Sequence, residues 1–91
     1  MSNTLTAHLE IAAVLLERAL VARDMAEGRH RIASSAYSRD EITAAEWHAT
    51  YRTWGVALED YQGALTHYTA VRLTAEMDAR ATVRTEEPNN G

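Results

Sequence analysis

The feature that most constrains the fold of this 91-residue chain is a run of large apolar side chains spaced alternately four and three residues apart. The run consists of Trp47, Tyr51, Trp54, Leu58, Tyr61, Leu65 and Tyr68. This spacing is typical of a helix face that packs lengthwise against another helix. Because Gly55 and Gly63 lie off that face and leave its phase unbroken, the pattern predicts one continuous helix over residues 39–83. A three-helix bundle with a break near Gly55 or Gly63 is the alternative.

A second pattern, earlier in the chain, predicts the helix that packs against this face. It consists of Leu5, Leu9, Ala12, Leu16, Ala19, Arg23 and Ala26, and it predicts a helix over residues 5–31. Residues 33–37 are expected to connect the two helices. Ser38 and Glu41 have the spacing of a capping box, which predicts the start of the second helix.

Folding the chain about residues 35–38 places large side chains of the second helix opposite small ones of the first. The expected pairs are Ala26–Trp47, Ala19–Trp54, Ala12–Tyr61 and Leu5–Tyr68, alternating with Arg23–Tyr51, Leu16–Leu58 and Leu9–Leu65. Interdigitating layers require large residues to meet small ones. The sequence therefore predicts an all-α antiparallel two-helix hairpin, with one domain over residues 1–85 and a disordered polar tail over residues 86–91.

Two groups of apolar residues have no partner in this hairpin. Ile11, Leu15, Ala22 and Met25 form a second stripe on the first helix, and Val71, Leu73 and Met77 extend beyond the start of that helix in the expected register. A helix that is apolar on two faces is usually buried on two faces. We therefore expect these seven residues to form an interaction surface through which two hairpins associate into a four-helix bundle. The alternative is that the end of the second helix frays and that the second stripe consists of tolerated surface apolar residues.

Composition excludes several classes of function. The formal net charge of −4 argues against a broad surface for nucleic acid or anionic membranes. The absence of cysteine excludes disulfides, thiolate catalysis and cysteine-based zinc sites. No apolar run is long enough to span a membrane, and the first residues lack the basic segment of a signal peptide, so we expect a cytoplasmic protein.

The charged residues suggest little chemistry. Glu27 and His30 have the spacing found in di-metal bundle sites, but the carboxylates expected near them suit helix caps, so we expect no metal or other cofactor. Arg23 is expected to be structural, either stacked on Tyr51 or its tryptophan neighbours as a cation–π contact or paired with a nearby carboxylate such as Glu27; the alternative is a buried anchor for an anion. We therefore predict a non-enzymatic protein that associates with itself and, in an accessory or inhibitory role, with another protein. The alternative is a small helical-bundle enzyme with an anion site lined by Arg18, Arg23 and Arg29 at a dimer interface.

Overall fold

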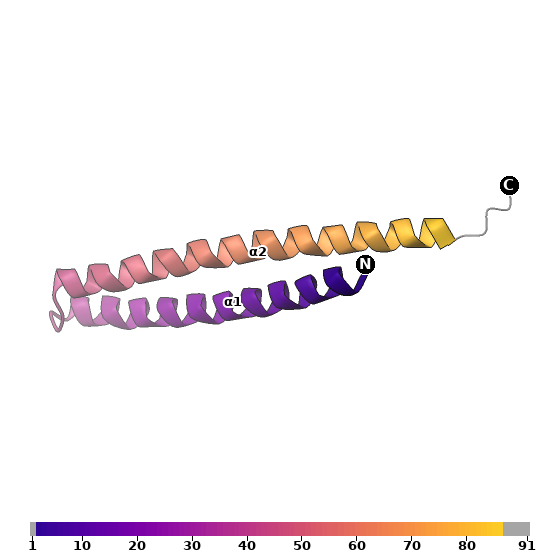
Figure 1. The fold of residues 1–91 in the computed structure, drawn as a ribbon. Helices are drawn as coiled ribbons and strands as arrows, with labels where there is room; N and C mark the ends of the chain where they lie inside the picture. Colours follow the sequence, from indigo (N-terminus) through magenta and orange to yellow (C-terminus); the bar gives the residue numbers. More distant parts are fainter. Residues whose placement is uncertain (1, 87–91) are drawn as a thin grey trace.

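The chain forms two long antiparallel helices joined by a turn at residues 39–43 (Figure 1). The computed structural model describes the backbone of residues 2–86 and the side chains of residues 4–81. Helix α1 spans Ser2–Ser38 and helix α2 spans Ala44–Glu86. Within these described residues there is no strand, and α2 is continuous through both glycines. The predicted all-α hairpin is thus confirmed, and the three-helix alternative is wrong.

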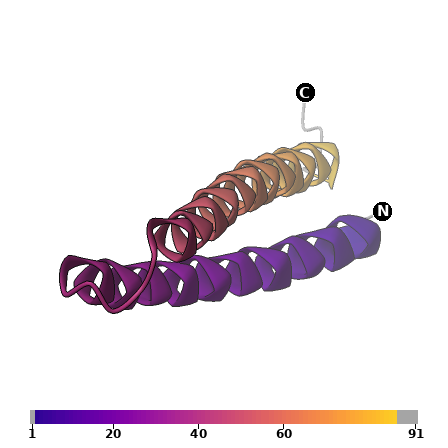
Figure 2. The same cartoon turned by 90° about the vertical axis from the view of Figure 1, so that its left-hand side faces the viewer.

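The two helices run side by side in a single layer, and no further described segment covers either of them (Figures 1 and 2). The hairpin is long and thin, with extents of 77 × 19 × 14 Å. None of the described helices has a stretch that is both long and apolar enough to cross a membrane. Apart from Glu86, which ends α2, the tail expected at residues 86–91 lies outside the described residues.

The predicted helix boundaries were wrong, most of all around the turn. Residues 33–37, expected to be a connection, are the last turns of α1. The serines there bond locally instead of breaking the helix. The Ser38 hydroxyl donates to the Ser35 carbonyl at 2.8 Å, and the Ser35 hydroxyl accepts from the Arg39 guanidinium at 2.9 Å. The outer ends also differ from those expected, because α1 already begins at Ser2 and α2 continues to Glu86.

Helix α1 ends in a Schellman motif. The Asp40 amide donates to the Tyr37 carbonyl at 3.0 Å, and the Glu41 amide donates to the Ala36 carbonyl at 2.9 Å. This pattern places Asp40 in the left-handed region, with φ 59°. Glycine usually takes that position, and aspartate is one of the few other residues that tolerate it. The absence of a glycine here is why sequence patterns did not indicate this helix end.

Helix α2 begins with a different capping box from the predicted one. The Thr43 hydroxyl accepts from the Glu46 amide at 3.2 Å, and the Glu46 carboxylate accepts from the Thr43 amide at 3.1 Å. These reciprocal bonds define the Ser/Thr-x-x-Glu motif. The predicted box of Ser38 and Glu41 does not form, because Glu41 instead accepts from the Arg39 guanidinium at 2.8 Å.

Moving the turn toward the C-terminus shifts the register of the hairpin by one heptad. Tyr51, expected to face Arg23, packs against His30, with ring centroids 5.5 Å apart. Trp47, expected to face Ala26, donates from its indole to the Ser34 hydroxyl at 2.8 Å. A shift of seven residues preserves the large-against-small pattern, so the sequence pattern alone was satisfied by either register.

Burial follows this register. On α1 every predicted inward residue from Leu5 to Ala26 is buried or half-buried, and the stripe continues to His30 and Ala33. On α2 the inward stripe is Trp47, Thr50, Trp54, Ala57, Tyr61, Ala64, Tyr68 and Val71. The prediction was right for Trp47, Trp54, Tyr61 and Tyr68. The intermediate positions of the inward stripe are one residue earlier than predicted, at the small residues Thr50, Ala57 and Ala64. Tyr51 and Leu65 are exposed, whereas Leu58, also predicted to lie inward, is half-buried beside the stripe.

The two capping boxes can be distinguished by mutation. Thr43→Ala removes the observed cap and should lower the free energy of unfolding by about 1 kcal/mol. Ser38→Ala removes only an exposed bond at the end of α1 and should cost less than about 0.5 kcal/mol. Urea denaturation of both variants measures the difference. A larger loss for Ser38→Ala than for Thr43→Ala would mean that α2 begins at the predicted position.

Candidate protein-docking groove

The interior of the hairpin is thin. Among the described side chains, the buried hydrophobic residues are Ala12, Ala26, Ala33 and Ala57, and no large side chain is fully buried. Alanine has no side-chain rotamer entropy to lose, but it also buries little apolar area. The alanines allow the helices to approach closely, and the large residues of α2 then lie along the interhelical line half-exposed. A single hairpin therefore has little hydrophobic core of its own.

Aromatic residues stabilise the turn end of the hairpin. His30 from α1 lies among three rings of α2, with centroids 5.3 Å from Trp47, 5.5 Å from Tyr51 and 5.2 Å from Trp54. The Thr50 hydroxyl donates to the Trp47 carbonyl at 2.8 Å and lies 3.0 Å from His30 Nδ1. The Thr50 hydroxyl thus links the Trp47 carbonyl of α2 to the His30 ring of α1.

Arg23 is held within the hairpin as a structural residue. Its guanidinium lies over the Tyr61 ring, 4.4 Å from the centroid, and forms an ion pair with Asp24 at 3.1 Å. The predicted kind of contact, a cation over a tyrosine, is confirmed. The predicted partner Tyr51 was wrong, because the shifted register brings Tyr61 within reach. The Glu27 carboxylate instead pairs with Arg31 at 3.4 Å.

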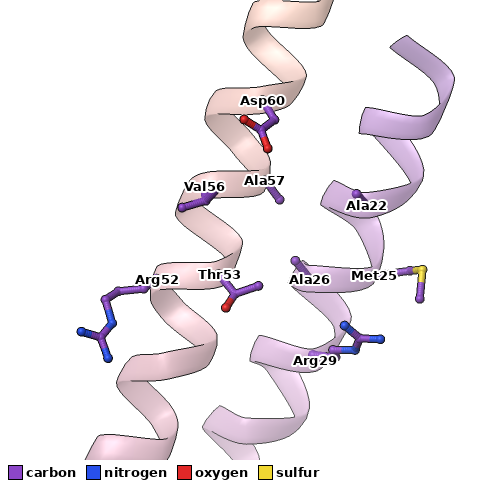
Figure 3. Close-up of a pocket in the computed structure, with 9 residues that line it drawn as sticks. All are labelled: Ala22, Met25, Ala26, Arg29, Arg52, Thr53, Val56, Ala57 and Asp60. Atoms are coloured by element: carbon purple, nitrogen blue, oxygen red, sulfur yellow. The ribbon is translucent and has the colours of Figure 1, made fainter. Parts of the chain in front are cut away.

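A groove lies between the two helices. Its widest part has a volume of about 500 Å³ and is drawn in Figure 3. Its lining residues are Ala22, Met25, Ala26 and Arg29 from α1 and Arg52, Thr53, Val56, Ala57 and Asp60 from α2. In Figure 3 Ala26 and Ala57 lie between the helices, whereas the Arg29 and Arg52 side chains extend outward on opposite sides. The floor is therefore apolar and the charges lie at the rim.

The groove continues in both directions through hollows that share lining residues. Toward the turn it runs past Ala49 and Thr50, still bounded by Arg29 and Thr53. Toward the N-terminus it follows α1, first through Val21 and Val14 and then to Leu15 and Ile11. We call this continuous surface, from Ile11 to Arg29 on α1 and from Ala49 to Asp60 on α2, the docking groove. Its length along α1 is about 27 Å at the rise of an α-helix.

Most of the predicted interaction residues lie exposed on this side. Ile11 is 58% exposed and Met25 is 52% exposed, and Leu15 and Ala22 are exposed beside them. Met77 and Leu73 are also exposed, and heptad spacing places Met77 on the same face of α2 as Val56. Val71 differs from expectation, because it is half-buried on the inward stripe of α2. The expectation that α2 has no partner helix from Val71 onward was also wrong, since Ala75 and Asp78 are half-buried as well.

The predicted surface omitted several exposed residues of similar character. Val14, Val21 and Val56 line the groove, and Ile32 is 73% exposed one heptad beyond Met25. The heptad from Met25 to Ile32 and the adjacent valines were visible in the sequence. Val56 could not be assigned to the surface from the sequence, because that assignment requires knowing which residues of α2 face α1.

The residues considered for chemistry do not converge. Arg18 and Arg29 line different parts of the groove about 16 Å apart along α1, and Arg23 is engaged by Tyr61 and Asp24. In the described part of the chain, no three or more histidine, aspartate or glutamate side chains are grouped so that they could hold a metal ion. Glu27 and His30 instead contact Arg31 and Thr50, respectively.

Comparison with known proteins identified no relative, since no family model, curated protein or solved structure matches this chain. The geometry of the groove is therefore the basis for assigning a role.

The two tryptophans provide a matched test of the turn-end packing. The Trp47 indole N–H has a hydrogen-bond partner in Ser34, whereas the Trp54 indole N–H is buried without a partner among the described residues. Replacing each with phenylalanine removes similar area, but only Trp47→Phe also removes a bond. Trp47→Phe should therefore cost about 1 kcal/mol more than Trp54→Phe in unfolding free energy. Equal losses in urea denaturation would mean that the Trp47–Ser34 bond contributes nothing.

Proposed function

We propose that this protein acts through protein–protein association, and that the docking groove binds a second copy of the chain to form a dimeric four-helix bundle. The observation that carries this proposal is a long exposed apolar groove on a hairpin whose buried core consists of alanines. Helices with apolar residues on two faces bury both faces in stable folds. The inward face of α1 packs against α2, whereas the groove face of α1 is exposed in the single hairpin.

The surface area of the hairpin supports this proposal. The chain exposes 7037 Å². A compact monomer of 10.1 kDa is expected to expose about 5,300 Å². The excess of about 1,700 Å² is roughly twice the area that one partner contributes to a stable interface of standard size. The elongated chain as a whole therefore exposes more surface than a standard dimer interface requires from one partner.

Pairing also buries apolar side chains, and this burial opposes the entropic cost of association. Fully burying a large aliphatic side chain contributes about 1.5–3 kcal/mol. Ile11, Leu15 and Met25 are each about half-exposed, so covering each contributes about 1 kcal/mol. A handful of such residues from each copy is comparable to the whole stability of a small domain. No catalytic step is part of this proposal.

The proposal is tested by solution mass. Analytical ultracentrifugation of the full chain at tens of micromolar should return twice the 10.1 kDa chain mass. Met25→Glu places a charge in the middle of the groove and should shift the protein to the monomer, because burying an unpaired carboxylate costs several kcal/mol.

Leu65→Glu is the matched control, since Leu65 is 41% exposed on the side of α2 that faces away from the groove. It should leave the dimer intact. A monomeric wild-type chain contradicts the proposal. Equal disruption by both variants would place the interface elsewhere.

A further inference from the structure

We infer that the two copies pair with their turns at the same end, so that α1 of each hairpin lies against α2 of the other. This arrangement rests on the proposed self-association and specifies which surfaces meet. It corresponds to a two-fold axis parallel to the helices. Three features favour it: the sizes of the side chains on the two sides of the groove, the register within one hairpin, and the space around one glycine.

The two sides of the groove differ in side-chain size. On α1 the exposed face carries the large residues Ile11, Met25 and Ile32, spaced by one or two heptads. On α2 the same side carries, at heptad spacing, the small residues Ala49, Gly63 and Ala70 and the medium-sized Val56, and the series ends in the larger Met77 near the level of the N-terminus of α1. Close packing between helices requires large residues to meet small ones. The complement of the α1 face is therefore the α2 face.

The register of one hairpin shows which residues would meet. His30 contacts Tyr51, so these two residues lie at one level along the axis. A two-fold axis parallel to the helices preserves levels, so each α1 residue meets the α2 residue of the second copy at its own level. The resulting pairs are Ile32 with Ala49, Met25 with Val56, Arg18 with Gly63, and Ile11 with Ala70. Each pair joins a large residue to a smaller one.

Pairing with the turns at opposite ends would be worse packed. It would lay α1 on α1 and α2 on α2, so that Ile11 met Ile32 while small residues faced small residues. Same-end pairing does bring Arg29 of one copy near Arg52 of the other. Both side chains are exposed at the rim, where solvent and salt screen their repulsion. Arg18 meanwhile comes within about one helical turn of the acidic Asp60 of the second copy.

Gly63 gives the arrangement a specific test. A Cβ atom at Gly63 or at Gly55 would have nothing within 4 Å in the single hairpin. Glycine in the middle of a helix disfavours folding, so neither glycine is explained by packing within the chain. Heptad spacing from Val56 places Gly63 on the groove side, whereas Gly55 lies on the other side of the inward stripe. In the dimer the stem of Arg18 from the second copy would cover Gly63.

Leucine substitutions at the two glycines compare the groove side of α2, at Gly63, with its other side, at Gly55. Gly63→Leu should weaken dimerisation at least about tenfold, because the added side chain collides with the second copy. Gly55→Leu should leave the dimer dissociation constant within about twofold. Both variants should keep the helical circular dichroism of the hairpin, since both sites are open within one chain. An unchanged dissociation constant for Gly63→Leu overturns the arrangement.

Disulfide trapping tests the relative orientation of the two copies directly. The chain has no cysteine of its own to interfere. Mixing Ile32→Cys with Ala49→Cys in a glutathione redox buffer should give a cross-linked heterodimer. Mixing Ile32→Cys with Ile11→Cys should not, because that pair meets only when the turns lie at opposite ends. Cross-linking of the second mixture in place of the first overturns the arrangement but leaves the proposed self-association standing. A wild-type chain that remains monomeric by mass overturns both.

Discussion

The packing of alanines on α1 against large residues on α2 determines the rest of this structure. Because Ala12, Ala26 and Ala33 are buried, the two helix backbones can approach closely. The tryptophans and tyrosines of α2 then fill the line between the helices without being enclosed. The same arrangement keeps the larger aliphatic residues of α1 out of the hairpin core and leaves them on a neighbouring face. A close-packed pair of helices and an exposed apolar groove are thus two results of one distribution of side-chain sizes.

Much of the fold was predictable from the spacing of residues along the chain. The all-α hairpin followed from the alternating four- and three-residue steps, and every predicted inward residue on α1 lies inward. The register could not be predicted, because a shift of seven residues preserves the same pattern. The register was set instead by the turn, where Asp40 takes a position that glycine usually occupies and Thr43 rather than Ser38 caps α2. Local hydrogen bonds decided between two registers that hydrophobic spacing left equal.

The candidate site was predictable in part for the same reason. The stripe of Ile11, Leu15, Ala22 and Met25 was visible as a second apolar period on α1, and it forms one side of the docking groove. Which residues of α2 line the groove depended on which of its residues face α1. Because Thr50 and Ala57 belong to the inward stripe, Val56 and Thr53 line the groove. The shifted register also turned Val71 from an expected contact for a partner into part of the hairpin's own packing.

The central claim is that the hairpin depends on a second copy covering its groove, and the concentration dependence of thermal unfolding tests it most directly. When folding and association are coupled, a higher protein concentration stabilises the folded dimer and raises the Tm. We predict that the Tm measured by circular dichroism rises steadily over a hundredfold increase in chain concentration. A Tm that stays the same over that range, with the chain monomeric throughout, would show that the hairpin is stable alone and would contradict the account.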